Sequence, residues 1–202
     1  MKLAVAALCA LCAPMLAACT LLSPVRMEGE KHALSKLPQV PRHPGQAKAR
    51  TGVLLVSIPT SDPAFDTTQM AYSVRPYQIA YFARNEWLDT PSRMLWPLLV
   101  RTLRDTGGFA AVVMPPYTGR FDHALQTRIL ELEQDLATEP ATLQLRLHVE
   151  LSDAAGRVIA TRDIEVRERM RERTPEAGVV AANDAVANAL LQLAAFLLQG
   201  AR

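Results

Sequence analysis

The chain has 202 residues and a formal net charge of +2, and half of its residues are apolar. This composition is typical of a compact globular domain and excludes a disordered stalk, because disordered segments are poor in apolar residues. A charge so close to neutral gives no support for bulk binding to nucleic acid.

The first 18 residues have the composition of a secretory signal peptide. Lys2 supplies a positive charge at the start, and the apolar run from Leu3 to Leu16 carries no charge. This run is shorter than the about 20 apolar residues that a transmembrane helix needs. We therefore expect residues 1–18 to be removed, which leaves 184 of the 202 residues. The net charge falls from +2 to +1 because Lys2 leaves with the signal.

Cys19 directly follows two small residues, and the sequence Leu16-Ala17-Ala18-Cys19 resembles the bacterial lipobox. In lipoproteins with this motif the peptidase cuts before the cysteine, which then carries acyl chains such as palmitate. Several chains hold a protein durably on a membrane, because each buried CH2 contributes about 0.8 kcal/mol. Thr20 stands where an inner-membrane retention signal usually has Asp, so the resemblance implies the outer membrane, facing the periplasm.

The alternative to lipidation is an ordinary signal peptide whose cysteine is accidental. Cys9 and Cys12 lie inside the removed segment, so Cys19 would be the only cysteine of the mature chain. A single thiol in an exported domain is a reactive or a modified group, which favours lipidation. With one cysteine the mature chain forms no internal disulfide, and its fold must depend on an apolar core.

Residues 19–50 are predicted to be the lipidated N-terminus and a flexible tether, followed by one domain over residues 51–202. The tether region has little periodicity and is marked by prolines and basic residues, namely Pro24, Pro38, Pro41, Pro44, Arg26, Lys31, Lys36, Arg42, Lys48 and Arg50. These basic residues are interpreted as solvated linker charge, with contact to anionic head groups as the alternative. A short strand within residues 31–36 is a further expectation.

Short strands are predicted in the first half of the domain. Residues 52–58 form an apolar run that is typical of a buried strand. Residues 69–74 and 77–82 are predicted to pair as a hairpin around Arg75-Pro76. Residues 109–114 are predicted to form another buried strand.

One helix is predicted from Pro91 to about Thr106. Thr90 is expected at its N-cap, Pro91 in its first turn and Gly107-Gly108 at its end. Apolar spacing predicts an inner stripe made of Leu95, Leu98, Leu99, Thr102 and Leu103. Pro97 is expected to distort the second turn, because proline lacks the amide hydrogen of an interior helical residue.

The second half of the domain is predicted to contain long strands and a final helix. Residues 143–151 alternate strictly between apolar and polar side chains, which is typical of a sheet with one wet face. Residues 124–137 and 158–170 are predicted to be its neighbours, and residues 175–199 an amphipathic helix. The acidic residues of the first neighbour share one face, interpreted as its solvent side: Glu131, Glu133 and Asp135. Together these elements predict a single α+β domain with a mixed, mostly antiparallel sheet and two main helices packed on one face.

The sequence contains no pattern of residues that is typical of a catalytic or metal site. The histidines are scattered at positions that do not match metal-ligand spacing, namely His32, His43, His123 and His148. Neither a Gly-x-Ser-x-Gly elbow nor a Walker-type run is present. We therefore predict that the protein is not an enzyme and uses no cofactor and no metal.

Residues 72–96 contain three of the four tyrosines and both tryptophans of the chain. Aromatic residues next to arginine favour interaction hot spots. The alternative, which the sequence leaves equally open, is that a hairpin and a helix pack these aromatic side chains against each other. On the first interpretation Tyr81, Arg84 and Trp87 are the candidates for a partner-binding surface.

Several of these features together resemble the ABC-type transport auxiliary lipoproteins. The resemblance is carried by Cys19, the strand that ends in Ile58-Pro59, the stretch Tyr-Gln-Ile-Ala-Tyr-Phe-Ala-Arg-Asn-Glu-Trp over residues 77–87, and the helical segment Trp96-Pro97-Leu98-Leu99. It covers essentially the whole mature chain, and the Asn-x-Trp segment before the helix is its most distinctive part. The family commonly begins its domain with a Tyr-x-Leu strand, in whose place this chain has His32-Ala33-Leu34.

The resemblance implies a fold similar to the N-terminal domain of TolB, no enzymatic activity, and attachment to the periplasmic face of the outer membrane through acylated Cys19. Proteins of this family are partners of MCE-type lipid transporters, related to the Pqi and Mla-like systems. The implied partner is therefore an MCE-domain protein of an ABC lipid transporter, which the folded domain would serve as an adaptor.

Three further points about function follow at this stage. A homo-oligomer is left open, and no nucleic acid is expected as a partner. The chain has no surplus of apolar residues to line a large cavity, so a role as adaptor is favoured over a role as lipid carrier. The alternative function is that of a TolB-like lipoprotein in envelope assembly, not tied to lipid transport.

Overall fold

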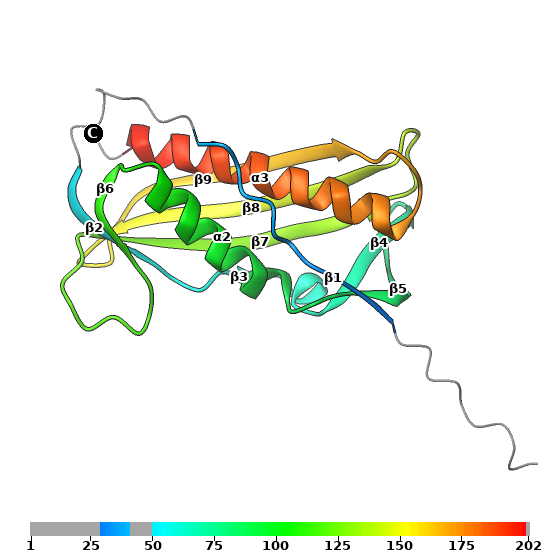
Figure 1. Ribbon diagram of the computed structural model, residues 1–202, viewed down its shortest axis with the longest axis horizontal. Coiled ribbons are helices and arrows are strands. Elements are labelled where there is room, and N and C mark those ends of the chain that lie inside the picture. The colour runs from blue at the N-terminus through cyan, green and yellow to red at the C-terminus, as the bar shows by residue number, and fades with distance from the viewer. Residues whose placement is uncertain (1–28, 41–49, 201–202) are drawn as a thin grey trace, which may run out of the picture.

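One long strand, β7 (His123–Asp135), organises a mixed sheet of nine strands. The structure, a computed structural model, describes residues 29–40 and 50–200 (Figure 1). Along one side β7 pairs antiparallel with β8 (Thr142–Asp153), which pairs antiparallel with β9 (Val158–Arg169). The apolar residues that alternate along β8 are buried, as the sequence predicts for a sheet covered on one face.

Three short strands pair one after another with the other side of β7. These are β2 (Arg50–Val56), β3 (Thr60–Ser61) and β4 (Gln69–Arg75), and all three run parallel to β7. A short 3-10 helix, η3 (Pro63–Phe65), lies between β3 and β4. Because β7 is paired on both sides, its side chains have a fixed direction, which decides what each face of the sheet presents.

The remaining strands extend the sheet beyond β2 and β4. β6 (Phe109–Val113) pairs parallel with β2, β5 (Gln78–Trp87) forms the predicted hairpin with β4, and β1 (Glu30–His32) pairs parallel with β5. The longest pairings are thus antiparallel, as predicted, and the short strands add parallel ones. The prediction of a buried strand over residues 109–114 is wrong in one respect: β6 is an outer strand whose middle residues, Ala110 and Ala111, are exposed.

Helix α2 (Pro91–Asp105) begins and ends as predicted. Pro91 occupies its first turn, and Gly107 follows its end with a φ of 64°, a conformation that glycine adopts without strain. The predicted inner stripe is buried, and the helix continues through Pro97. Thr90 stands at the N-cap position, but its hydroxyl lies 3.2 Å from the hydroxyl of Ser92 and makes no capping bond to the backbone.

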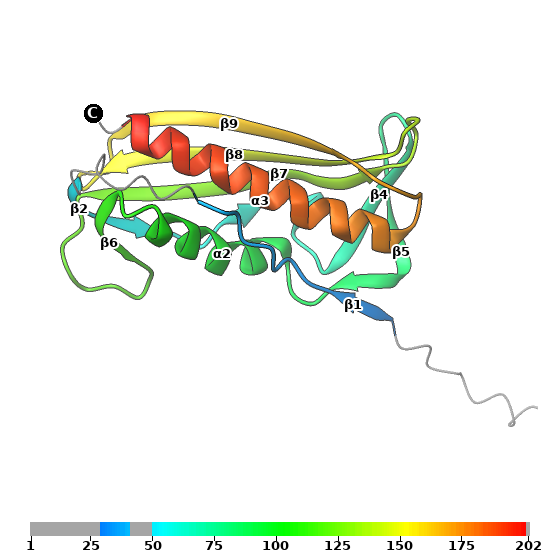
Figure 2. The same ribbon diagram turned by 45° about the horizontal axis from the view of Figure 1, so that its top comes forward.

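Helix α3 (Pro175–Gly200) covers the same face of the sheet as α2, above β8 and β9 (Figures 1 and 2). By length and composition this helix could cross a membrane, but half of its most apolar 18-residue stretch is buried within the fold. Its contact side includes fully buried alanines, Ala182, Ala185 and Ala189, which allow the helix to approach the sheet closely. Gly178 of α3 lies against the side-chain amide of Gln134 on β7. A Cβ atom added at Gly178 would lie 2.0 Å from the amide carbon of Gln134.

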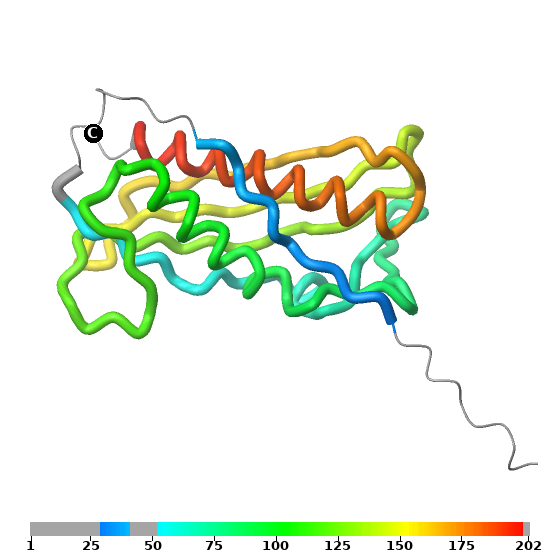
Figure 3. Tube along the Cα trace, in the orientation of Figure 1, coloured from blue at the N-terminus to red at the C-terminus, as the bar shows by residue number. Residues whose placement is uncertain are grey.

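Residues 29–40 run across α3 on the outer side of the helix layer (Figures 1 and 3). The main-chain N–H of Leu88 donates to the carbonyl of His32 (2.7 Å), and the side chain of Leu34 is buried in the core. The prediction of a flexible tether over residues 19–50 is therefore wrong for residues 29–40, because β-pairing and burial fix this part to the domain. Residues 19–28 and 41–49 lie outside the described residues.

Asn183 of α3 holds this crossing segment with its side-chain amide. Its Oδ1 accepts hydrogen bonds from the main-chain N–H groups of Ser35 (2.8 Å) and Lys36 (3.0 Å). Its Nδ2 donates to the carbonyl oxygen of Ala33 (3.0 Å). Lys36 also forms an ion pair with Asp184, so two successive residues of α3 bind the segment. We call this set of contacts the Asn183 clasp.

Replacing Asn183 with Ala is expected to lower the free energy of unfolding by about 1–3 kcal/mol, because main-chain groups of the crossing segment lose their partners. The melting temperature should fall by about 2–4 °C per kcal/mol. Hydrogen exchange should speed up at Ser35 and Lys36. The matched control is Asn188→Ala, which removes an exposed asparagine of the same helix that bonds Glu168 instead. Unchanged exchange at Ser35 in the Asn183 variant would contradict this role.

Candidate functional site

The sequence singled out Tyr81, Arg84 and Trp87 of β5 as a contact surface, and the structure separates them. Tyr81 is 37% exposed, and its hydroxyl donates a hydrogen bond to the carbonyl of Ala64 (3.0 Å). Arg84 is exposed on the same strand. Trp87 is only 3% exposed and belongs to the hydrophobic core, so its place in a contact surface is wrong. Contact of Tyr81 and Arg84 with a partner stays a prediction.

Most aromatic residues of this region pack inside the fold. Trp87 is covered where β1 pairs with the end of β5, opposite His32. The indole N–H of Trp96 donates to the carbonyl of Val56 (3.2 Å), and the rings of Tyr72 and Phe82 lie 4.4 Å apart. For these residues the interpretation as internal packing is correct.

A groove of about 600 Å³ lies beside the β4–β5 hairpin, on the sheet face that points away from the helices. It runs between the hairpin and the second half of β7. Its lining residues are Phe65, Ser73, Arg75, Pro76, Tyr77, Gln78, Ile79, Leu130, Glu131, Glu133, Asp135, Ala137, Thr138 and Arg146. We call it the hairpin groove. Its volume lies within the range of ligand sites in proteins, about 300–1,000 Å³.

The direction of the acidic side chains in this groove follows from the alternation along β7. Gln134 points to the helix layer, where it meets Gly178, so its neighbours Glu133 and Asp135 point to the opposite face. An irregularity in the β7–β8 register at Leu130 sets this phase, because Ile129 is buried opposite Leu147 whereas Glu131 pairs with Arg146. The predicted solvent-facing row of acids is thus confirmed, and it lines the groove.

The carboxylates of the groove differ in their partners. Glu131 forms an ion pair with Arg146 (3.4 Å), and Asp135 accepts hydrogen bonds from the Ala137 amide (2.9 Å) and the Gln144 side chain (3.0 Å). Glu133 accepts one bond at Oε1, from the Ser73 hydroxyl (3.3 Å), while its Oε2 is buried and without a hydrogen-bond partner. Glu133 is thus the carboxylate of the groove that has an oxygen without a hydrogen-bond partner.

The pKa of Glu133 is raised above its ordinary value, chiefly by burial and then by the charges of Glu131 and Asp135. The hydrogen bond from Ser73 opposes this rise in pKa. The sequence predicted the acidic row but not this environment, because the hairpin that crowds Glu133 approaches from a distant part of the chain. No local signal in residues 131–135 could have revealed it.

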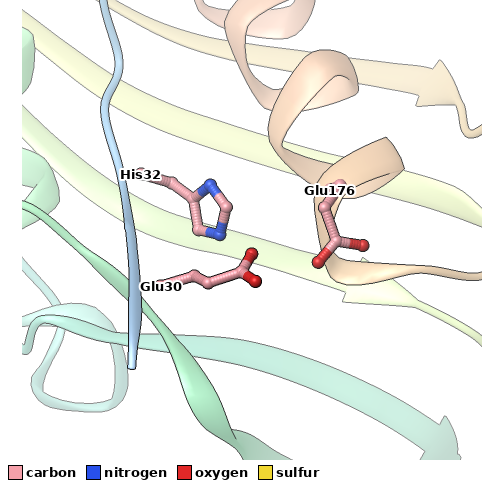
Figure 4. Close-up of side chains that lie close together, drawn as sticks. All are labelled: Glu30, His32 and Glu176. Atoms are coloured by element: carbon pink, nitrogen blue, oxygen red, sulfur yellow. The ribbon is translucent and has the colours of Figure 1, made fainter. Parts of the chain in front are cut away.

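A second group of polar side chains lies where β1 meets the first turn of α3 (Figure 4). Ligand atoms of Glu30, His32 and Glu176 lie within 4.8 Å of one another. Imidazole and carboxylate are suitable ligands for metals such as zinc. However, Nε2 of His32 is engaged with Oδ1 of Asn85 (2.7 Å), and both glutamates are exposed. We therefore assign no ion to this group.

A histidine–carboxylate pair is present on the outer face of β8 and β9. Nδ1 of His148 and Oδ1 of Asp163 lie 2.6 Å apart, and both side chains are largely exposed to solvent. A general base in catalysis needs a substrate site within hydrogen-bond reach and protection from water. A pair so open to solvent gives no support for an assignment as a catalytic dyad.

Replacing Glu133 with Gln is expected to raise the melting temperature at neutral pH, by less than about 4 °C. The raised pKa of Glu133 means that folding favours its protonated form. The corresponding stability is present below the ordinary glutamate pKa and is lost as the pH rises through the raised pKa. The melting temperature of the variant should therefore exceed that of the parent at neutral pH and equal it at acid pH.

Thermal unfolding followed by circular dichroism at both pH values measures this difference. Glu165→Gln is the matched control, since Glu165 is exposed, lies opposite Arg146 in the β8–β9 register on the same sheet face, and forms its ion pair with Arg167 (2.8 Å). A Glu133 variant that is less stable than the parent at neutral pH would show that the ionised carboxylate stabilises the fold.

Two of the solved structures that are similar to this fold show how far the likeness extends. Protein XCC0632 from Xanthomonas campestris, of the DUF330 family, shares 20% sequence identity with a TM-score of 0.72, covering 85% of this chain and 95% of that chain. An uncharacterized protein shares 12% identity with a TM-score of 0.66, covering 84% of this chain and 99% of that chain. At these identities the likeness shows the fold alone. Among curated proteins, none matches this chain in sequence.

The family assignment comes from the sequence itself. The family described as "ABC-type transport auxiliary lipoprotein component" matches residues 32–194, which include β5, α2, the long strands β7 to β9 and most of α3. The match begins at His32, inside the segment that pairs with β5, and so extends over nearly all of the described fold. The chain therefore belongs to the family of ABC-type transport auxiliary lipoprotein components.

Proposed function

We propose that this protein is the non-catalytic, membrane-anchored component of an MCE-type ABC transport system that moves lipids across the periplasm. The observation that carries the proposal is the family match over residues 32–194, preceded by the lipobox-like sequence that ends in Cys19. Acylated Cys19 would hold the chain on the periplasmic face of the outer membrane. The folded domain would then serve as an adaptor for the MCE-domain protein.

The start of the described fold supports a position close to the membrane. Gly29 is followed directly by β1, at the end of the sheet that carries β4 and β5 (Figure 1). Gly29 lies ten positions after Cys19, and a chain of this length reaches at most about 36 Å when fully extended. A partner would therefore meet the domain within a short distance of the membrane surface.

The packing of the fold supports the role of adaptor over that of lipid carrier. The space between the sheet and the helices is filled by fully buried side chains of both layers, among them Leu99, Leu145 and Leu147. A carrier must enclose acyl chains in an apolar cavity, and burying them would require displacing this core. The hairpin groove lies on the other face and is lined in part by charged residues.

Cys19→Ser is expected to move the protein from the membrane fraction to the soluble periplasmic fraction, because the acyl chains supply the membrane affinity. Mass spectrometry of the purified parent should find fatty acid on Cys19. Cys9→Ser is the matched control, since Cys9 lies in the predicted signal peptide and its loss should change neither result. Equal membrane association of the Cys19 variant and the parent, with no fatty acid on the parent, would refute the anchor.

The adaptor role predicts that the parent chain, purified from detergent-solubilised envelope under mild crosslinking, recovers an MCE-domain protein. The Cys19→Ser variant should recover less of it, because the short tether no longer places the domain. Recovery of envelope-assembly proteins in place of the MCE-domain protein would instead support a TolB-like assembly lipoprotein.

A further inference from the structure

We propose that the hairpin groove binds a segment of a partner protein in which a lysine or arginine lies next to an apolar residue. This inference rests on the proposed adaptor function, and it names the surface and the chemistry of contact. The cation would meet Glu133, and the apolar neighbour would pack on Tyr77 and Ile79 of the hairpin.

The charge argument starts from the unequal partners of the acids in the groove. The carboxylates of Glu131 and Asp135 are each satisfied by groups of this chain, whereas one oxygen of Glu133 is buried without a partner. A buried acceptor without a hydrogen bond costs free energy, and a charge-assisted bond from an ammonium or guanidinium group removes that cost. Within residues 29–40 and 50–200 the Ser73 hydroxyl is the hydrogen-bond partner of Glu133, and a cation from another protein would supply the second.

The apolar argument concerns the tip of the β4–β5 hairpin. Tyr77 is fully exposed and has a φ of 63°, in the left-handed region where a non-glycine residue costs roughly 1–2 kcal/mol. Glycine or asparagine is the usual choice at such a turn position. A strained, exposed tyrosine at this position contributes little to the stability of the free fold. Such residues are typical of binding sites, where tyrosine supplies contact area at low cost in conformational entropy.

The same groove is unfavourable for a lipid head group. Of the two arginines that line it, Arg146 is paired with Glu131, which leaves the one charge of Arg75 to balance the two carboxylates of Glu133 and Asp135. The lining therefore carries excess negative charge, which repels a phosphate group. An open groove also gives no enclosed space for acyl chains. A cationic protein segment fits both properties, with contact of the apolar residue to the hairpin adding hydrophobic burial.

Site-specific photo-crosslinking in cells that express the full chain tests the proposal. Tyr77 is replaced by p-benzoylphenylalanine, and the same replacement at Tyr117 is the matched control. Tyr117 is also an exposed tyrosine, on the connection between β6 and β7 at the opposite end of the sheet (Figure 1). Position 77 is expected to give a crosslinked peptide of another protein, with lysine or arginine close to the attachment point as read by mass spectrometry.

Glu133→Gln supplies the second measurement, because it removes the charge and keeps the acceptor for Ser73. The yield of the crosslink at position 77 should fall by about tenfold or more, as for the loss of a hydrogen bond to a charged group. Glu165→Gln, an exposed glutamate on the same sheet face outside the groove, should leave the yield unchanged. Tyr77→Gly should also lower recovery of the same partner without lowering the melting temperature, since glycine adopts the positive φ freely.

Each outcome separates this inference from the proposed function. A crosslink from position 77 to phospholipid or to a second copy of this chain would overturn the inference. So would a yield that Glu133→Gln does not change, or a product at position 77 no more abundant than at position 117. If an MCE-domain protein is still recovered by purification in these cases, the proposed function stands and the groove is not its contact. A cation-bearing peptide from a protein outside any transport system would support the groove and contradict the function.

Discussion

The packing of helix α3 against the sheet is the constraint on which the rest of the structure depends. Leu190, Leu193 and Leu197 are completely buried on this helix, and the buried alanines that precede them bring it close to β8 and β9. Burial of apolar surface is the main driving force of folding, and this contact joins the end of the chain to its longest strands. It also supplies the platform on which the N-terminal segment is bound.

The same contact determines what the opposite face of the sheet can present. Once Gln134 is directed to α3, the alternation of β7 beyond the irregularity at Leu130 directs its acidic neighbours away from the helices. The outer face is therefore free to carry charge without cost to the core. The hairpin bounds this face at one end and turns a flat acidic row into a groove in which Glu133 is half-buried. A groove lined with charge can thus arise from a strand pattern together with one distant hairpin.

Sequence patterns predicted the elements whose signals are local. The proline and glycines around α2 mark its ends, and the alternation along β8 marks a half-buried strand. The parallel pairing of β2, β3 and β4 with β7 was not predictable, because it joins residues more than 60 positions apart without any local signal. Trp87 was wrongly predicted to lie in a contact surface for the same reason. Its burial depends on β1, a three-residue strand in a region whose sequence is typical of a linker. The direction of the acidic row was predictable, and the loss of solvent around Glu133 was not.

Under the proposed anchoring through Cys19, the route of residues 29–40 would have a mechanical consequence. Tension applied through the anchor would pull first on the three-residue ladder between β1 and β5 and on the Asn183 clasp. Parallel strands pulled along their axis resist as a group, because their hydrogen bonds must break together. The load would then pass to the end of β5 and to the middle of α3, and would leave the long β7–β8–β9 pairings outside its path. Because β5 is also a strand of the hairpin beside the groove, tension at the N-terminus would act on one wall of the groove and not on the three long strands.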